Sequence, residues 1–139
     1  MLNFLKVLIF GTWVSLTPEP VDLVPPALEI VLEDPISALT PGAHLRIDIS
    51  QHITGTDVIS KLDQAKEFMA SECLTAELFS AEGKVYSLDY LYQSTGKDTT
   101  ELVLARDGGV PVDTDFVKVV IESCKPVSEV VIKWSNFKM

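Results

Sequence analysis

The chain has 139 residues, 47% of them hydrophobic, and carries 20 acidic against 11 basic side chains, a formal net charge of −9. This length fits one domain with a single core. A body of this charge repels phosphate backbones and anionic lipid headgroups, and the sequence has no basic stripe with interleaved aromatic residues, so nucleic acid is excluded as the expected partner. The acidity is either a surface for a basic protein or a solvated surface that keeps the chain soluble.

Residues 1–16 form an apolar segment behind a positive start, with Lys6 as the one charged side chain. This pattern is typical of a secretory signal peptide or a short membrane anchor. The apolar run is shorter than the ~20 residues that a membrane-spanning helix needs. No small-x-small cleavage site follows it, so an uncleaved anchor and a removed signal both stay open. The alternative is a buried strand or helix of an ordinary domain core.

Residues 17–26 follow as a proline-rich segment, with Pro18, Pro20, Pro25 and Pro26 among ten positions. Proline fixes φ, removes a backbone donor and moves its predecessor out of the helical region. We interpret the segment as a stiff tether between an anchor and a domain that spans residues 27–139, with an edge-strand lead-in as the alternative. The compartment that follows is periplasmic, secreted or membrane-anchored on the outside, with membrane contact only through residues 1–16.

From residue 27 onward the hydrophobic residues alternate with a period of two, which predicts about seven strands separated by turn residues. The positions expected on the buried faces are Leu28, Ile30 and Leu32; Leu45, Ile47 and Ile49; Leu74, Ala76 and Leu78; Tyr86, Leu88, Tyr90 and Tyr92; Leu102 and Leu104; Val117, Val119 and Ile121; and Val130, Ile132 and Trp134.

This pattern predicts an all-β fold, an antiparallel β-sandwich of immunoglobulin-like architecture, with a small barrel as the alternative. Trp134 lies after both cysteines, whereas the buried tryptophan of antibody-type domains lies between them. The immunoglobulin-like label therefore describes architecture and implies no function.

One segment, residues 57–72, has helical periodicity instead. Val58, Leu62, Ala65 and Met69 share one helical face. We expect a short helix or helical loop here, with Ser60 and Asp63 as a capping box in its first turn. Such a segment is either a binding element or, more in keeping with its amphipathic pattern, a cap over one end of the sheet.

Two cysteines, Cys73 and Cys124, allow one pairing. In an oxidising compartment they would form a disulfide that closes a long loop and stabilises the chain by about 4 kcal/mol. The alternative is a pair of buried thiols, as in a cytosolic protein. Neither cysteine has the ligand spacing of a zinc site with His44 or His52.

No catalytic motif is present, and we expect no enzyme and no cofactor. His44 and His52 flank one predicted strand without a serine or cysteine nucleophile beside them in sequence, and the G-x-S-x-G and phosphate-loop patterns are missing. The only metal candidates are Asp107, Asp113 and Asp115, whose carboxylates share one glycine-containing loop, and a solvated turn is the preferred explanation of them, so we expect no metal site.

These observations favour a non-enzymatic binding domain of the cell envelope or secreted space that recognises a protein partner through an acidic surface, which would suit a basic partner. The three tyrosines Tyr86, Tyr90 and Tyr92 are either part of the core or an aromatic binding surface. Alternative functions are an inhibitor or immunity-type protein that masks a basic catalytic cleft and a structural accessory subunit of the envelope. An enzyme whose site forms only on folding is a third hypothesis.

Overall fold

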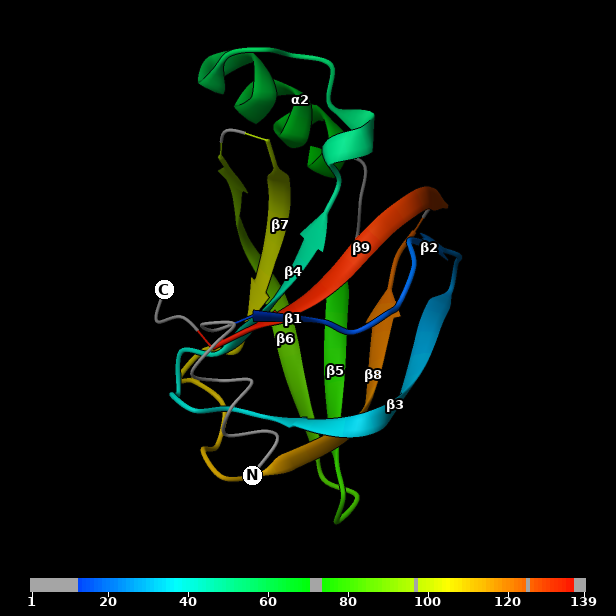
Figure 1. Cartoon of the computed structure of the whole chain (residues 1–139), viewed down its shortest axis with the longest axis vertical. Coiled ribbons are helices and arrows are strands. Elements are labelled where there is room, and N and C mark those ends of the chain that lie inside the picture. The colour runs from blue at the N-terminus through cyan, green and yellow to red at the C-terminus, as the bar shows by residue number, and fades with distance from the viewer. Residues whose placement is uncertain (1–12, 71–73, 97, 125, 137–139) are drawn as a thin grey trace.

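The computed structural model describes residues 13–70, 74–96, 98–124 and 126–136 (Figure 1). The elements, in chain order, are β1 (Trp13–Ser15), β2 (Val21–Leu23), β3 (Ala27–Ser37), β4 (His44–Asp48), the 3-10 turn η1 (Ser50–His52), α2 (Val58–Ala70), β5 (Thr75–Ser80), β6 (Val85–Thr95), β7 (Thr100–Ala105), β8 (Asp115–Glu122) and β9 (Val127–Ser135).

The strands form one curled antiparallel sheet in the order β1-β9-β4-β7-β6-β5-β8-β3, and β2 also pairs with β9. The predicted mostly antiparallel β fold with one helix is confirmed. The two-sheet sandwich and its immunoglobulin-like architecture are not confirmed, because the strands follow one another in a continuous path of hydrogen-bonded neighbours. Within the segment interpreted as a tether, β2 hydrogen-bonds with β9 and Leu23 is buried.

The core lies on the concave side of the sheet. It is built from the apolar residues whose alternation predicts the strands. The predicted inward residues of β4, β5, β7 and β9 are buried. The ring of Phe116 lies edge-on between Tyr86 and Trp134, with ring centroids 5.8 and 6.0 Å apart. An irregularity in β8 pairs Phe116, rather than Val117, with Ser80. Phe116 therefore enters the core in place of Val117, which the unbroken alternation predicts there.

Two contacts bring the end of β3 to the end of β9 and so curl the sheet. The indole N–H of Trp134 donates to the Ser37 carbonyl over 3.1 Å, and the Leu39 N–H donates to the Asn136 side chain over 2.9 Å. The pairing of β3 with β8 is irregular between Val31 and Ile36. Irregularities of this kind bend a strand and increase its twist, which lets β3 turn across the sheet (Figure 1).

The predicted helix is confirmed as α2, which lies at one end of the curled sheet (Figure 1) and buries Ala65 in the core. Its cap is Asp57, not the predicted pair of Ser60 and Asp63. The Asp57 carboxylate accepts from the Ser60 N–H over 2.8 Å and from the Ser60 hydroxyl over 3.0 Å. These two bonds lower the pKa of Asp57. The Gln64 side-chain oxygen accepts from two backbone N–H groups of the preceding loop, which holds that loop against the helix.

A bulge in β6 separates the three tyrosines. Tyr90 pairs with Leu104, which faces the core. Tyr92 pairs with Val103, which is adjacent to Leu104 in β7 and lies on the opposite face of the sheet. Tyr86 and Tyr90 therefore pack against the core, whereas Tyr92 is exposed. Burial raises the pKa of Tyr90, whose hydroxyl donates to the Gln93 side chain. Among the described residues, no helix is long and apolar enough to cross a membrane.

Candidate functional site

The outer face of β3, β8, β5 and β6 gathers negative charge, and we call it the acidic face. Its carboxylates are Glu29, Glu77, Asp89 and Glu122, one from each strand. Glu29, Asp89 and Glu122 are exposed, and Glu77 is half-buried. The residues that alternate with them point inward and belong to the core. Four carboxylates are thus held on a rigid sheet and not on mobile loops.

Strand register sets the spacing of these carboxylates. Glu122 lies opposite Thr75, and Glu77 lies opposite Val120. Thr75 lies in turn opposite Asp89 on β6. The carboxylates therefore occupy diagonal positions on neighbouring strands, where residues lie about 7–8 Å apart. No two of them are directly opposite, which limits their mutual repulsion while it concentrates negative potential over the face.

A row of three apolar residues and one lysine borders the carboxylates on the same face, and we call it the apolar row. Strand register aligns Val31, Lys118, Phe79 and Val85 across β3, β8, β5 and β6. Val31 is 72% exposed and Val85 is 45% exposed. The Lys118 ammonium lies 4.2 Å from the centre of the Phe79 ring and 3.7 Å from a Glu29 carboxylate oxygen. The acidic face therefore combines unbalanced negative charge with exposed apolar surface.

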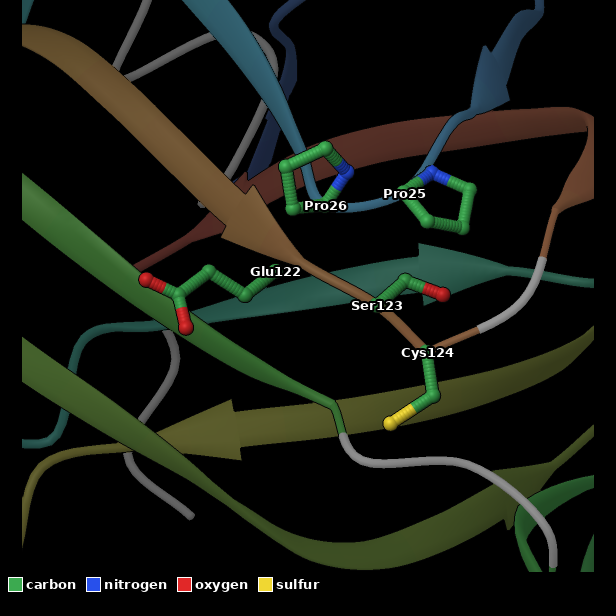
Figure 2. Close-up of a pocket in the computed structure, with 5 residues that line it drawn as sticks. All are labelled: Pro25, Pro26, Glu122, Ser123 and Cys124. Atoms are coloured by element: carbon green, nitrogen blue, oxygen red, sulfur yellow. The ribbon is translucent and has the colours of Figure 1, made fainter.

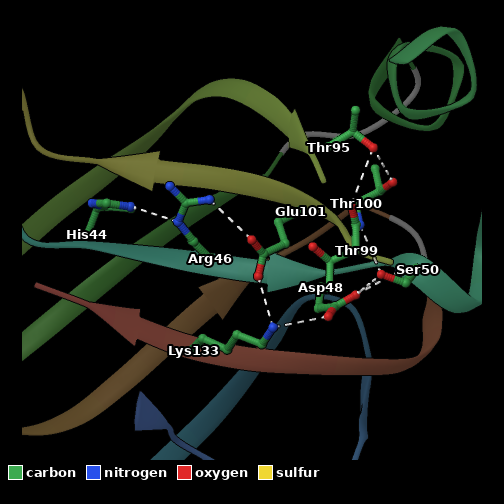
Figure 3. A network of polar contacts seen from close by, with 9 residues as sticks. All are labelled: His44, Arg46, Asp48, Ser50, Thr95, Thr99, Thr100, Glu101 and Lys133. Carbon is green, nitrogen blue, oxygen red and sulfur yellow. Dashed lines mark hydrogen bonds and ion pairs between the residues drawn. The ribbon is translucent and has the colours of Figure 1, made fainter. Parts of the chain in front are cut away.

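A second polar cluster lies on the outward side of β4, β7 and β9, and Figure 3 shows it as a chain of contacts. Arg46 donates to Glu101 over 3.1 Å, and Lys133 donates to Glu101 over 3.0 Å and to Asp48 over 3.2 Å. Asp48 also accepts the N–H and hydroxyl of Ser50. These four charged side chains are only 12 to 22% exposed and cancel one another, so the network binds three strands together without net charge.

The network continues through Thr100 and Thr95. The Thr100 N–H donates to the Ser50 hydroxyl oxygen over 2.9 Å, and the hydroxyls of Thr100 and Thr95 lie 2.9 Å apart. Burial alone would lower the pKa of Lys133, but its hydrogen bonds and charge interactions with Glu101 and Asp48 together raise it. The ammonium therefore stays charged, and it joins β9 to the carboxylates of β4 and β7 and does not act as a base.

His44 ends the network on the other side, and both of its ring nitrogens are engaged. Arg46 Nε–H donates to His44 Nε2 over 3.0 Å, so this nitrogen carries no proton, and Nδ1–H donates to the Gly42 carbonyl over 2.9 Å. Burial is the main cause of a lowered His44 pKa. A neutral imidazole with both nitrogens bonded has no free position from which to activate a nucleophile. His52 lies apart, exposed, with Nε2 2.6 Å from the Ser128 carbonyl oxygen.

A hollow at the end of β8 has a volume of about 520 Å³ and is lined by Pro25, Pro26, Glu122, Ser123 and Cys124. Figure 2 shows the two proline rings across from the end of β8, with the Cys124 sulfur directed away from them. The Ser123 N–H donates to the Pro26 carbonyl over 3.3 Å, which joins the two sides. Among its five lining residues Glu122 alone is charged, so the hollow has no converging set of charged side chains with which to bind a partner.

The predicted disulfide partner Cys73 lies outside the described residues, so its pairing with Cys124 stays a prediction. The metal candidates Asp107, Asp113 and Asp115 are all exposed. Over the described ranges, no three His, Cys, Asp or Glu side chains come together as ligands for a metal ion. Asp113 has φ of 63° and Gly109 has φ of 88°, so a left-handed backbone accounts for the residue types at these two positions, while Asp115 begins β8.

The acidic face and the buried network both escape prediction from the sequence. The alternation identifies which positions of each strand face outward. Four of these positions hold the carboxylates of the acidic face, Glu29, Glu77, Asp89 and Glu122. Their assembly depends on β8 lying between β3 and β5, which alternation cannot reveal. Comparison with known proteins adds no family: no protein-family model, no curated protein and no solved structure matches this chain.

Proposed function

We propose that this chain is a non-enzymatic domain that binds a basic protein partner through the acidic face. The observation that carries the proposal is the alignment of four carboxylates and an exposed apolar row on one rigid surface. Negative potential steers a basic partner toward the face, and the apolar row supplies area that can be buried on contact. The apolar residues 1–16 support a location outside the cytoplasm, in the periplasm, the secreted space or on the outer side of a membrane. Because Trp13–Ser15 of this segment form β1 and pair with β9, the proposal takes the segment as retained and not as a removed signal.

The buried network supports a binding domain over an enzyme. Its carboxylates and cations are paired with one another, and the His44 nitrogens are bonded to Gly42 and Arg46. A catalytic site needs a titratable group that faces a cavity and a substrate. Here the titratable groups face each other between strands, and this arrangement serves the rigidity of the sheet.

Paired charge-reversal variants test the proposal. Glu77→Lys/Glu122→Lys changes the acidic face, while Asp63→Lys/Glu82→Lys makes the same change in net charge at exposed positions on α2 and the β5–β6 turn. Each chain is used to capture proteins from an extract of its source cells at low salt. A partner should be retained by the wild type and the control and lost from the face variant, with a drop in affinity of about ten- to thirty-fold.

Salt provides a second criterion. Raising the ionic strength to about 1 M shortens the Debye length to about 3 Å, so a complex formed across exposed charges should release its partner. A partner that is retained equally by all three chains, or that stays bound at this salt, would contradict recognition through the acidic face. Thermal unfolding of each variant confirms that lost binding does not reflect lost structure.

The compartment and the disulfide form a second part of the proposal. In an oxidising compartment Cys73 and Cys124 would pair, and the pair would tie the start of β5 to the end of β8. The intact mass of the protein purified from its native compartment, alkylated without reductant, would then show no added label. Two alkylated thiols in that material would contradict an exported, oxidised state.

A further inference from the structure

We propose that the outer edge of β3, over Ala27–Val31, takes up an extended basic segment of the partner as an additional strand. This inference rests on the proposed function and specifies how the partner binds: main-chain hydrogen bonds at the edge, and alternate side chains beside the acidic face. Addition of a strand to a sheet edge is a recurring mode of peptide recognition.

The position of β3 in the sheet is the first argument. β3 ends the strand order, and within the described ranges it pairs with β8 alone. The register from Ala27 opposite Glu122 to Val31 opposite Lys118 runs without a shift. A regular strand with one neighbour presents a row of N–H and C=O groups on its other side, and these groups can pair with an added strand.

The absence of the usual edge protection is the second argument. Exposed edges are commonly blunted by lysine, proline or a bulge. The stretch Ala27–Val31 holds none of these, while Pro35 and the irregular pairing lie together after Val31. The part of β3 that is suited to accept a strand is therefore also the part that borders the acidic face.

Side-chain chemistry selects the kind of strand. Ala27, Glu29 and Val31 alternate on the outer face of β3, and all three are exposed. A strand added at this edge would place its own outward side chains about 4.5–5.5 Å from them. Lysine or arginine opposite Glu29 and an apolar residue opposite Val31 would complement the face, so a segment in which basic and apolar residues share one side fits best.

Charge disfavours a second copy of this chain as the occupant. Each copy carries a net charge of −9, and β3 itself holds Glu29, Glu33 and Asp34 without any basic residue. Pairing of two β3 edges would bring carboxylates of both copies together, and like charges on adjacent strands are destabilising. A basic segment of another protein removes this repulsion and gains from the same charges.

The test uses a model segment and amide hydrogen exchange. The probe is a synthetic peptide of about eight residues in which lysine and valine alternate, a length typical of a strand. A matched peptide with glutamate in place of lysine is the control. Exchange rates of the Ala27–Val31 amides are measured by NMR in the wild-type chain, in Glu29→Lys and in Glu82→Lys, at low salt with each peptide and without peptide.

The lysine peptide should slow exchange of the outward-facing β3 amides about tenfold or more in the wild type and in Glu82→Lys. It should have no such effect in Glu29→Lys, and the glutamate peptide should have none in any chain. Salt-sensitive binding that leaves β3 exchange unchanged would overturn strand addition while it leaves recognition by the acidic face intact. Failure of the lysine peptide to bind would overturn both proposals. Protection of β3 without peptide that rises with protein concentration would assign the edge to self-association and overturn the inference.

Discussion

Removing the Lys133 ammonium should destabilise the fold far more than removing it together with one of its carboxylate partners. In the wild type this ammonium lies 3.2 Å from Asp48 and 3.0 Å from Glu101, and all three side chains are at most 15% exposed. Lys133→Met leaves two carboxylates and one cation, Arg46, in the network. One negative charge is then held away from water without an opposite charge to balance it, which is the situation that makes broken buried ion pairs costly.

The size of the effect follows from this geometry. Loss of one partner of a fully buried pair costs about 3–5 kcal/mol, and the remaining exposure of these groups reduces the cost to about 2–4 kcal/mol. Asp48→Asn in the Lys133→Met background removes the unpaired charge, and the amide oxygen can still accept from Ser50. Arg46 and Glu101 remain as a neutral pair 3.1 Å apart. The double variant should therefore be about 1–2 kcal/mol more stable than Lys133→Met alone.

Urea unfolding followed by tryptophan fluorescence is a suitable assay, because Trp134 is 1% exposed in the folded chain. The wild type, both single variants and the double variant are compared at neutral pH, with the slope of each transition checked for constancy. If the losses of the two single variants simply add in the double variant, the four charges do not act as a balanced network and the reasoning is refuted.

Three further outcomes are expected. The free energy of unfolding should fall as the pH falls below the ordinary histidine pKa of 6.5, because the pKa of His44 is lowered in the folded chain and the unfolded chain binds the extra proton. The slope approaches about 1.4 kcal/mol per pH unit. Urea midpoints measured across this pH range should show the slope in the wild type, and His44→Gln should lack this contribution. Phe116→Ala should cost about 3–5 kcal/mol by urea unfolding, since it empties a fully buried ring site, and a cost below 1 kcal/mol would argue against that packing. Gly109→Ala should lower the melting temperature more than Gly108→Ala. Both glycines have positive φ, but only at Gly109 would the added Cβ lie 2.8 Å from the Pro41 carbonyl oxygen. Equal decreases in melting temperature would show that the structure relieves this contact without cost.

The sequence predicts which faces of most strands are buried, because a period of two reports the face directly. It gives β1 and β2 only as alternatives, a core strand within residues 1–16 and an edge-strand lead-in within residues 17–26, because the apolar run and the prolines favour an anchor and a tether there. It also misplaces Tyr92 and Val117, since one extra residue at a bulge moves a side chain to the opposite face while the alternation of residue types continues.

The candidate sites are less predictable than the strands for a related reason. Arg46 and Asp48 occupy positions that alternate with core residues and read as solvent-facing, yet both are largely buried. Their partners Glu101 and Lys133 come from strands far along the chain, and only the strand order brings them together. Alternation shows which face each residue of a single strand occupies. A site on a sheet also depends on which strands lie side by side, and alternation does not show this.

The double role of β9 has a consequence for how the molecule is made. The first two strands of the described residues, β1 and β2, both pair with β9, the last described strand. During synthesis β1 and β2 cannot form these pairs until β9 has left the ribosome. Folding of the described sheet therefore waits for β9 and is of high contact order, and a chain shortened before β9 would leave β1 and β2 without the strand they pair with.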